Sequence, residues 1–299
     1  MSASAPSTAS SNAAKLPQRP YGKRAVTLSI LGFGGILVMN AEQDHANRLV
    51  AQAVEAGVNY FDVAPSYGNA QERLGPALEP HRKHCFLACK TTARDAAGAR
   101  AELQASLAQL RTDHFDLYQL HGLVDMTKDV DPAFSKGGAI ETLQEARKSG
   151  QVRHLGFSAH SVEAALAALD RFAFDSVLLP VNFATFYAGH FGPTVLKKTQ
   201  EQQVSVLALK SLARQRWPEN HPERKRYSKV WYQPLTDPAE AELALRFTLS
   251  QPVTAALPPG EEELFWLALD IARRFRPITA EETQALQKMA ATIEPIFRA

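Results

Sequence analysis

Short apolar runs alternate with longer segments whose apolar residues recur three or four positions apart. Runs rich in β-branched residues are typical of buried strands, and the longer spacing is typical of amphipathic helices. Strands are predicted at residues 27–32, 58–63, 84–90, 115–121, 152–158, 176–181, 204–209 and 253–256. Helices are predicted between and after them, at residues 42–56, 71–78, 97–110, 140–149, 162–172, 194–202, 239–249 and 262–274.

Eight strands, each followed by a helix, indicate a parallel sheet with right-handed crossovers. Eight such units in about 250 residues favour a closed barrel over an open doubly wound sheet. The stretch Gly32-Phe-Gly-Gly35 lacks the spacing of the dinucleotide fingerprint and precedes no immediate helix, which also argues against the open sheet. The fold class is therefore expected to be α/β, as a single-domain (β/α)8 TIM barrel.

The two ends of the chain depart from this rhythm. Residues 1–16 are rich in Ser and Ala and lack the apolar centre of a secretory signal, so a disordered tail is expected there. Residues 17–299 are expected to form the barrel with an extra C-terminal helix, at residues 281–295. A capping box at residues 279–282 opens that helix.

Composition narrows the class of protein. A formal net charge of +2 over 299 residues lacks the basic excess of a nucleic-acid binder. No run of 18 apolar residues is present, so no membrane helix is expected and the cytoplasm is the default compartment. Two cysteines, Cys85 and Cys89, are too few for a disulfide framework or a zinc site, and are expected to be packing residues. No metal site is predicted, and the oligomeric state stays open.

Candidate chemistry lies where three consecutive predicted strands end. Asp62, Lys90 and His121 each close an apolar run. Strand periodicity puts each on the inward face, and neighbouring strands lie about 4.8 Å apart, so the three side chains should converge. Catalytic residues of such barrels lie at this end of the strands. Tyr67, five residues after Asp62, is close enough to reach the same point.

These four residue types suggest proton transfer. An ammonium at Lys90 should lower the pKa of Tyr67 and ease proton donation to a developing alkoxide. Asp62 should offset the buried charge of Lys90, and His121 should donate a hydrogen bond to a carbonyl.

The sequence here resembles the aldo-keto reductases. The resemblance rests on Tyr60-Phe-Asp-Val-Ala-Pro-Ser-Tyr-Gly68, on Lys90 in the next strand and on Leu120-His121 in the one after, and it extends over residues 17–275. It implies that Asp62, Tyr67, Lys90 and His121 form a catalytic tetrad that reduces a small carbonyl substrate with NAD(P)H.

The resemblance also implies a set of cofactor contacts, from Gly34, Gly35, Ser158, Asn182, Lys210, Ser211, Leu212 and Gly260. Ser158 and Asn182 would bind the nicotinamide carboxamide. This chain has Ala159 where an asparagine usually follows the serine, and Leu209 where many members place an aromatic residue.

Cofactor preference depends on the segment after Gly260. It is acidic, at residues 261–263, where the family usually places basic residues that hold the 2′-phosphate. Carboxylates repel a phosphate and favour ribose hydroxyls, which makes NAD(H) a candidate. Lys210, Arg214 or Arg216 could supply the phosphate contact instead, and the family's habit favours NADP(H).

Several alternatives remain. The same barrel could be a non-catalytic or slow nicotinamide-binding regulatory protein, or an aldolase with Lys90 as its Schiff-base nucleophile. His160 is expected to be a loop histidine near a helix cap, with a substrate contact as the second interpretation. Trp217, Trp231 and Tyr232 belong to a long polar segment, residues 212–234, that is either a substrate lid or packing.

Overall fold

The computed structural model describes residues 15–22 and 26–299 of the chain. Most of the expected tail, residues 1–14, lies outside the described residues. Leu16, at the end of that expected tail, is buried and packs against the main core.

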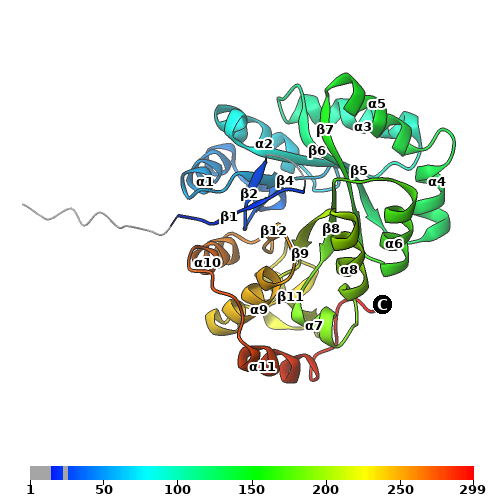
Figure 1. Ribbon diagram of the computed structural model, residues 1–299. Coiled ribbons are helices and arrows are strands. Elements are labelled where there is room, and N and C mark those ends of the chain that lie inside the picture. Colours follow the sequence, from blue (N-terminus) through cyan, green and yellow to red (C-terminus); the bar gives the residue numbers. More distant parts are fainter. Residues whose placement is uncertain (1–14, 23–25) are drawn as a thin grey trace, which may run out of the picture.

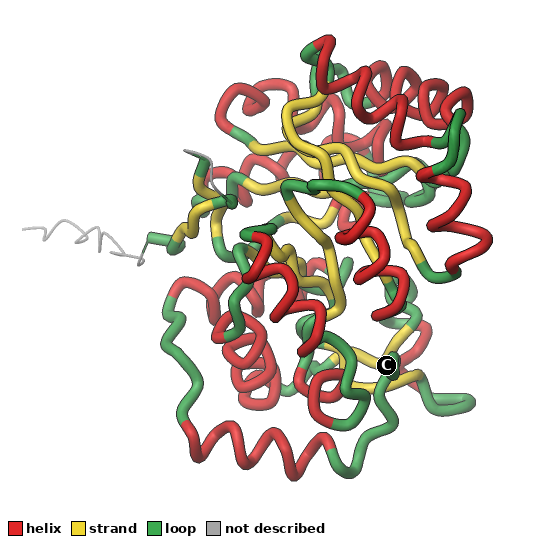
Figure 2. Tube along the Cα trace, turned by 45° about the vertical axis from the view of Figure 1, so that its right-hand side comes forward, coloured by secondary structure: helices red, strands yellow, loops and turns green. Residues whose placement is uncertain are grey.

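Eight strands form one sheet around the centre of the molecule, as Figures 1 and 2 show. Every neighbouring pair is parallel, and a parallel bridge from Leu31 to Ala256 joins the first strand region to the last. The strands are β3 (Phe33–Gly34), β4 (Tyr60–Asp62), β5 (Phe86–Thr91), β6 (Phe115–Leu123), β7 (Val152–Ala159), β8 (Ser176–Pro180), β9 (Ser205–Leu209) and β12 (Ala255–Leu257). The predicted single-domain (β/α)8 barrel is confirmed.

Helices cover the outside of the strands (Figure 2). The longer ones are α1 (Gln43–Glu55), α2 (Ala70–Leu78), α3 (Ala96–Gln109), α5 (Ala139–Ser149), α6 (Val162–Arg171), α8 (Pro193–Gln202), α9 (Pro238–Ser250), α10 (Glu262–Arg273) and α11 (Ala280–Ala290). Two shorter helices, α4 (Asp131–Phe134) and α7 (Phe183–Tyr187), lie in the loops after β6 and β8. The apolar faces of the helices around the barrel are buried, as Leu103, Leu107 and Leu110 of the α3 region are.

The prediction that residues 27–32 form the first strand of the barrel is wrong. Residues Thr27–Ser29 form β2, which pairs antiparallel with β1 (Gln18–Pro20), and the first barrel strand is β3. A period-two apolar pattern specifies an extended segment but not which strand it pairs with. Tyr21 and Leu28 of this hairpin pack inside the barrel against Tyr60 and Phe86, so the hairpin closes the end where the strands begin.

The long polar segment, residues 212–234, is folded, and its residues 229–232 line a cavity at the mouth of the barrel; it is called the lid below. It contains β10 (Ala213–Arg216), which pairs antiparallel with β11 (Tyr232–Pro234), and a short 3-10 helix at Pro222–Lys225. The Lys229 ammonium donates to the Leu37 carbonyl at 2.7 Å, so the lid is bonded across the mouth of the barrel.

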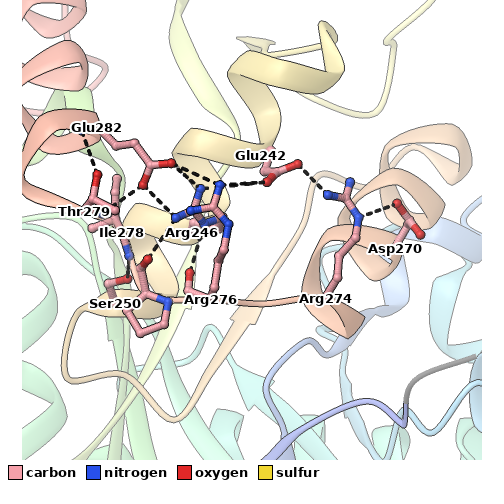
Figure 3. Close-up of polar contacts among 10 residues, drawn as sticks. Glu242, Arg246, Ser250, Asp270, Arg274, Arg276, Ile278, Thr279 and Glu282 are labelled. Atoms are coloured by element: carbon pink, nitrogen blue, oxygen red, sulfur yellow. Dashed lines mark hydrogen bonds and ion pairs between the residues drawn. The ribbon is translucent and has the colours of Figure 1, made fainter.

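A buried arginine fixes the C-terminal helix (Figure 3). Arg246 of α9 donates two hydrogen bonds to the Glu282 carboxylate, both at 2.7 Å, and two more to the carbonyls of Arg276 and Pro277. Glu282 also completes the capping box with Thr279 that starts α11. The chain after α11 returns to the barrel mouth, so this ion pair positions the C-terminal segment.

Glu282→Gln should lower the free energy of unfolding by about 2–3 kcal/mol, because it removes the closer counter-charge of a buried guanidinium and leaves only Glu242, at 3.8 Å. The neighbouring exposed Glu281→Gln is the control and should change it by less than about 0.5 kcal/mol. Urea unfolding at pH 7 measures both, and equal effects would contradict this account.

The same interaction gives a pH dependence. Hydrogen bonds from Arg246 and from the Thr279 backbone lower the pKa of Glu282 to about 2. The stabilisation is fully present above the unfolded-state pKa of about 4.3 and is lost as the pH falls towards 2. The stability difference between wild type and Glu282→Gln should therefore shrink over that range.

Candidate active site

A buried ion pair lies at the ends of two adjacent strands. Lys90 of β5 donates a hydrogen bond to Asp62 of β4, and the two side chains are 0% and 2% exposed. The Lys90 ammonium also donates to the Val63 carbonyl at 3.1 Å. The second carboxylate oxygen of Asp62 accepts from the Tyr60 hydroxyl at 3.2 Å and from Gln119 Nε2 at 3.1 Å. Both charges are thus paired and hydrogen-bonded, as burial requires.

Lys90 stays protonated in this environment. Burial lowers its pKa, but the charge of Asp62, the neighbouring Tyr67 and the hydrogen bond to Asp62 together raise it by more, so the net change is upward. A Schiff-base nucleophile needs a neutral amine, so this pKa argues against the aldolase alternative.

Tyr67 lies beside this pair, on the loop between β4 and α2. The Lys90 ammonium is 5.5 Å from the centroid of its ring. The expectation that Lys90 brings the pKa of Tyr67 below its usual value is wrong. Burial raises the pKa of Tyr67 by more than the charge of Lys90 lowers it, and the Asp62 carboxylate raises it further. The phenol therefore keeps its proton at neutral pH.

His121 faces the same phenol from β6. Its ring meets the Tyr67 ring edge-on, with centroids 5.9 Å apart, and its Nδ1 is 3.4 Å from the Ser66 hydroxyl. Arg94 donates to the His121 carbonyl at 2.7 Å and holds the backbone in place. Burial lowers the pKa of His121 to about 3, helped by the positive charges of Lys90, Arg94 and Lys210. The imidazole is therefore neutral and can donate one hydrogen bond.

A cavity of about 260 Å³ opens above the ion pair. It is lined by residues from the strand ends, the lid and the β12–α10 loop: Gly34, Ile36, Asp62, Tyr67, His121, His160, Leu178, Leu209, Lys210, Lys229, Val230, Trp231, Tyr232, Leu257, Pro258, Pro259 and Gly260. Trp231 and Tyr232 thus belong to the site, whereas Trp217 packs on His221 and Tyr227 away from it. A larger cavity, about 690 Å³, lies at the other end of the barrel and holds none of the tetrad.

His160 lies between β7 and the Ser161 cap of α6, as expected for a loop histidine near a helix cap, and it also lines the cavity. Its Nε2 is 3.2 Å from the Lys210 ammonium, and its ring stacks on Phe297, with centroids 5.1 Å apart. Phe297 comes from the C-terminal segment. The sequence gives no signal for these contacts, because the three residues are distant along the chain.

The expected cofactor residues fall into two groups. Gly34, Lys210 and Gly260 line the cavity, and Gly35, Ser158, Asn182, Ser211 and Leu212 lie outside its lining. Gly35 and Gly260 are required by packing, because an added Cβ would lie 2.7 Å from Val63 and 2.3 Å from Ile36.

Two buried polar atoms in the second group have no partner among the described residues. Asn182 Oδ1 accepts from the Thr185 amide at 2.9 Å and caps α7, which leaves its Nδ2 unpaired. The Ser211 hydroxyl oxygen is also unpaired. The Ser158 hydroxyl accepts from the Gly122 amide at 2.7 Å and keeps its proton free to donate. Unpaired buried donors are costly, so this donor set fits a polar ligand such as a carboxamide.

The acidic residues after Gly260 are all engaged. Glu261 accepts from the Lys229 amide at 2.8 Å, Glu262 lies 2.8 Å from His45 Nε2, and Glu263 pairs with Arg226 at 2.6 Å. Arg226 thus offsets the charge of Glu263, and none of the three carboxylates lines the cavity.

The cysteines, the metal-binding side chains and the apolar helices were considered in the sequence as well. Cys85 and Cys89 are buried and free, as expected for packing residues. Within residues 15–22 and 26–299, no three or more His, Cys, Asp or Glu side chains are grouped to hold a metal ion. In the same part of the chain, no helix has the length and apolar character to cross a membrane.

Comparison with known proteins places this site in a family. The model of the Aldo/keto reductase family matches residues 31–289, which is most of the chain. The chain belongs to the aldo/keto reductase family. The barrel and the oxidoreductase class follow from this membership, and so does the use of a nicotinamide cofactor, NAD(P)H, on small carbonyl substrates.

Individual relatives agree with the match, two over nearly the whole chain and one over about half of it. The oxidoreductase YqkF of Bacillus subtilis is 25% identical, over 94% of this chain and 98% of that protein. L-galactose dehydrogenase of Arabidopsis thaliana is 26% identical over about half of each chain, 52% and 53%. The aldo-keto reductase AKR11C1 of Bacillus halodurans in its holo form superimposes with a TM-score of 0.71, at 25% identity, over 92% of this chain and 96% of that one.

His121 should show no protonation between pH 5 and pH 8, because its pKa lies near 3. Nitrogen-15 NMR of labelled histidines measures this, with His121→Asn as the control that assigns the signal. A His121 resonance that titrates near pH 6.5, the ordinary value, would contradict the arrangement of buried cations around it.

Proposed function

We propose that this aldo/keto reductase reduces an aldehyde or ketone to the alcohol, with Tyr67 as the proton donor and Asp62, Lys90 and His121 completing the catalytic tetrad. The observation that carries the proposal is the placement of one phenol between a buried ammonium and a neutral imidazole at the cavity floor. When bound, the reduced nicotinamide supplies the hydride to the carbonyl carbon.

The chain's own residues supply the proton and stabilise charge. The neutral His121 donates a hydrogen bond to the carbonyl oxygen and orients it towards Tyr67. As the carbonyl carbon gains the hydride, the oxygen takes the phenolic proton and becomes the hydroxyl of the alcohol. The Lys90 ammonium stabilises the phenolate that remains, and solvent returns the proton. The raised pKa of Tyr67 favours the protonated form that reduction requires.

For the cofactor we propose contacts from Gly34, Gly35, Ser158, Asn182, Ser211, Leu212 and Gly260. Lys210, which the resemblance also names as a cofactor contact, is assigned a different role below. The free hydroxyl proton of Ser158 and the unpaired Nδ2 of Asn182 support the carboxamide part of this proposal. NADP(H) is the favoured form, since Arg226 offsets the charge of Glu263 and none of the three glutamates that would oppose a 2′-phosphate lines the cavity. The cytoplasmic location stays a prediction.

A regulatory nicotinamide-binding protein is the second candidate. The cavity of about 260 Å³ is smaller than the roughly 300–1,000 Å³ usual for drug-sized ligands, so it leaves little room for a substrate beside the nicotinamide. Slow turnover with tight cofactor binding would distinguish it from a reductase.

Tyr67→Phe should lower the kcat for carbonyl reduction by about 100-fold or more, because it removes the general acid and little else. Tyr118→Phe is the matched control. Tyr118 is a buried tyrosine of β6 in the outer core, and its hydroxyl has no partner among the described residues. Steady-state assays with a panel of aldehydes measure both variants. Near-normal turnover of Tyr67→Phe would disprove its role as the proton donor.

NADPH and NADH titrations, followed in parallel by fluorescence, test the cofactor proposal. Saturable binding with a Kd of about 10 µM or less is expected, with NADPH tighter. Tighter binding of NADH than of NADPH would indicate that the acidic segment at residues 261–263 binds the ribose hydroxyls. Binding of neither would remove the hydride source and end the reductase proposal.

A further inference from the structure

Lys210 is a cation without an acidic partner. It directly follows β9, and its φ of 63° lies in the left-handed region, which is unfavourable for a lysine and persists only where the surroundings fix it. No carboxylate of the described residues lies within 4 Å of its ammonium, whereas Lys90, buried below the cavity, is paired with Asp62. The only hydrogen-bond partner found for the ammonium, among those residues, is His160 Nε2 at 3.2 Å.

The surroundings of Lys210 are aromatic. Its ammonium lies 5.7 Å from the ring centroid of Trp231 and 5.6 Å from that of Phe297. Burial lowers the pKa of Lys210 to about 7, and burial lowers the pKa of His160 well below its usual value. His160 is thus neutral and accepts from Lys210, which leaves two ammonium protons to donate. An anion that binds there restores the charge that burial disfavours.

Lys210 lies near His160 and His121 in the lining of the cavity. Its charge lowers the pKa of both His121 and His160, which shows that all three groups lie close together. The other lysine of the cavity lining, Lys229, has different neighbours: its ammonium donates to the Leu37 carbonyl and its backbone amide donates to Glu261. The ammonium of Lys229 is thus already engaged by a backbone carbonyl, whereas that of Lys210 is bonded only to His160 among the described residues.

We propose that Lys210 and His160 form a carboxylate-binding subsite, and that the substrates of this enzyme are oxo acids. The carbonyl lies at Tyr67 and His121, and the carboxylate accepts hydrogen bonds from the Lys210 ammonium, with Trp231 and Phe297 packing on the carbon chain between them. One ammonium matches a carboxylate monoanion, whereas a phosphate dianion would leave one negative charge unpaired. This inference rests on the proposed reductase function, and it reassigns Lys210 from the cofactor phosphates to the substrate.

A matched pair of substrates tests the subsite. 5-Oxopentanoate and pentanal share the aldehyde and the chain length and differ only in the carboxylate. The wild type should prefer 5-oxopentanoate in kcat/KM by about tenfold to 100-fold, which is the usual effect of a hydrogen bond to a charged group. Lys210→Met should abolish that preference, mainly through KM, and Lys210→Arg should retain most of it. Lys225→Met, an exposed lysine of the lid away from the cavity, is the control and should keep the wild-type preference.

Cofactor affinity separates the two roles of Lys210. Lys210→Met should change the Kd of NADPH and NADH by less than about twofold. A rise of tenfold or more, with equal loss of activity on both aldehydes, would assign Lys210 to the cofactor and overturn the subsite. A wild type that does not prefer the oxo acid would overturn it as well.

Pentanoate binding to the protein–NADP⁺ complex, measured by calorimetry, needs no turnover. Pentanoate should bind the wild type and Lys210→Arg, and it should bind Lys210→Met at least about tenfold more weakly. The wild type should also bind pentanoate more tightly than pentanol. If that pattern holds while neither aldehyde is reduced, the subsite stands and the proposed reduction fails. If pentanoate binds wild type and Lys210→Met equally, the subsite fails whatever the turnover shows.

Discussion

The buried pair of Lys90 and Asp62 is the constraint on which the rest of the site depends. An ammonium that is 0% exposed is unfavourable unless a counter-charge and hydrogen bonds accompany it. Asp62 supplies the charge, and Tyr60, Gln119 and the Val63 carbonyl complete the hydrogen bonds. All of these groups come from consecutive strands, so the barrel is the scaffold that places them. The phenol of Tyr67 then takes its properties from the balance between burial and this one positive charge.

Segments far apart in the sequence close the cavity above the pair. The lid brings Trp231 and Tyr232, and the C-terminal segment brings Phe297, which stacks on His160. The contact between Phe297 and His160 depends on the Arg246–Glu282 pair. This pair fixes α11, and the C-terminal segment follows directly after α11. A reaction that transfers hydride and a proton benefits from such a cover, since water competes for both.

Much of this arrangement could be predicted from the sequence, and the exceptions have physical reasons. Strand periodicity alone put Asp62, Lys90 and His121 on inward faces at adjacent strand ends, where the structure has them. The pairing of Thr27–Ser29 could not be predicted, because a local pattern does not name the partner strand. The direction in which the pKa of Tyr67 shifts could not be predicted either, because it depends on how completely the folded chain removes water from the phenol. The contact between Lys210 and His160 joins residues 50 positions apart, which no spacing rule reaches.

The most direct test of the central claim is the single-turnover rate of hydride transfer in the double variant Asp62→Asn/Lys90→Met. Removing both charges together leaves no unpaired ion, so the double variant should fold with nearly wild-type stability, while either single variant loses about 3–5 kcal/mol. Hydride transfer in the folded double variant should nevertheless be slower by about 100-fold or more, because Tyr67 has lost the charge that stabilises its phenolate. A wild-type rate in that protein would show that the buried pair serves only the fold, and would contradict this account.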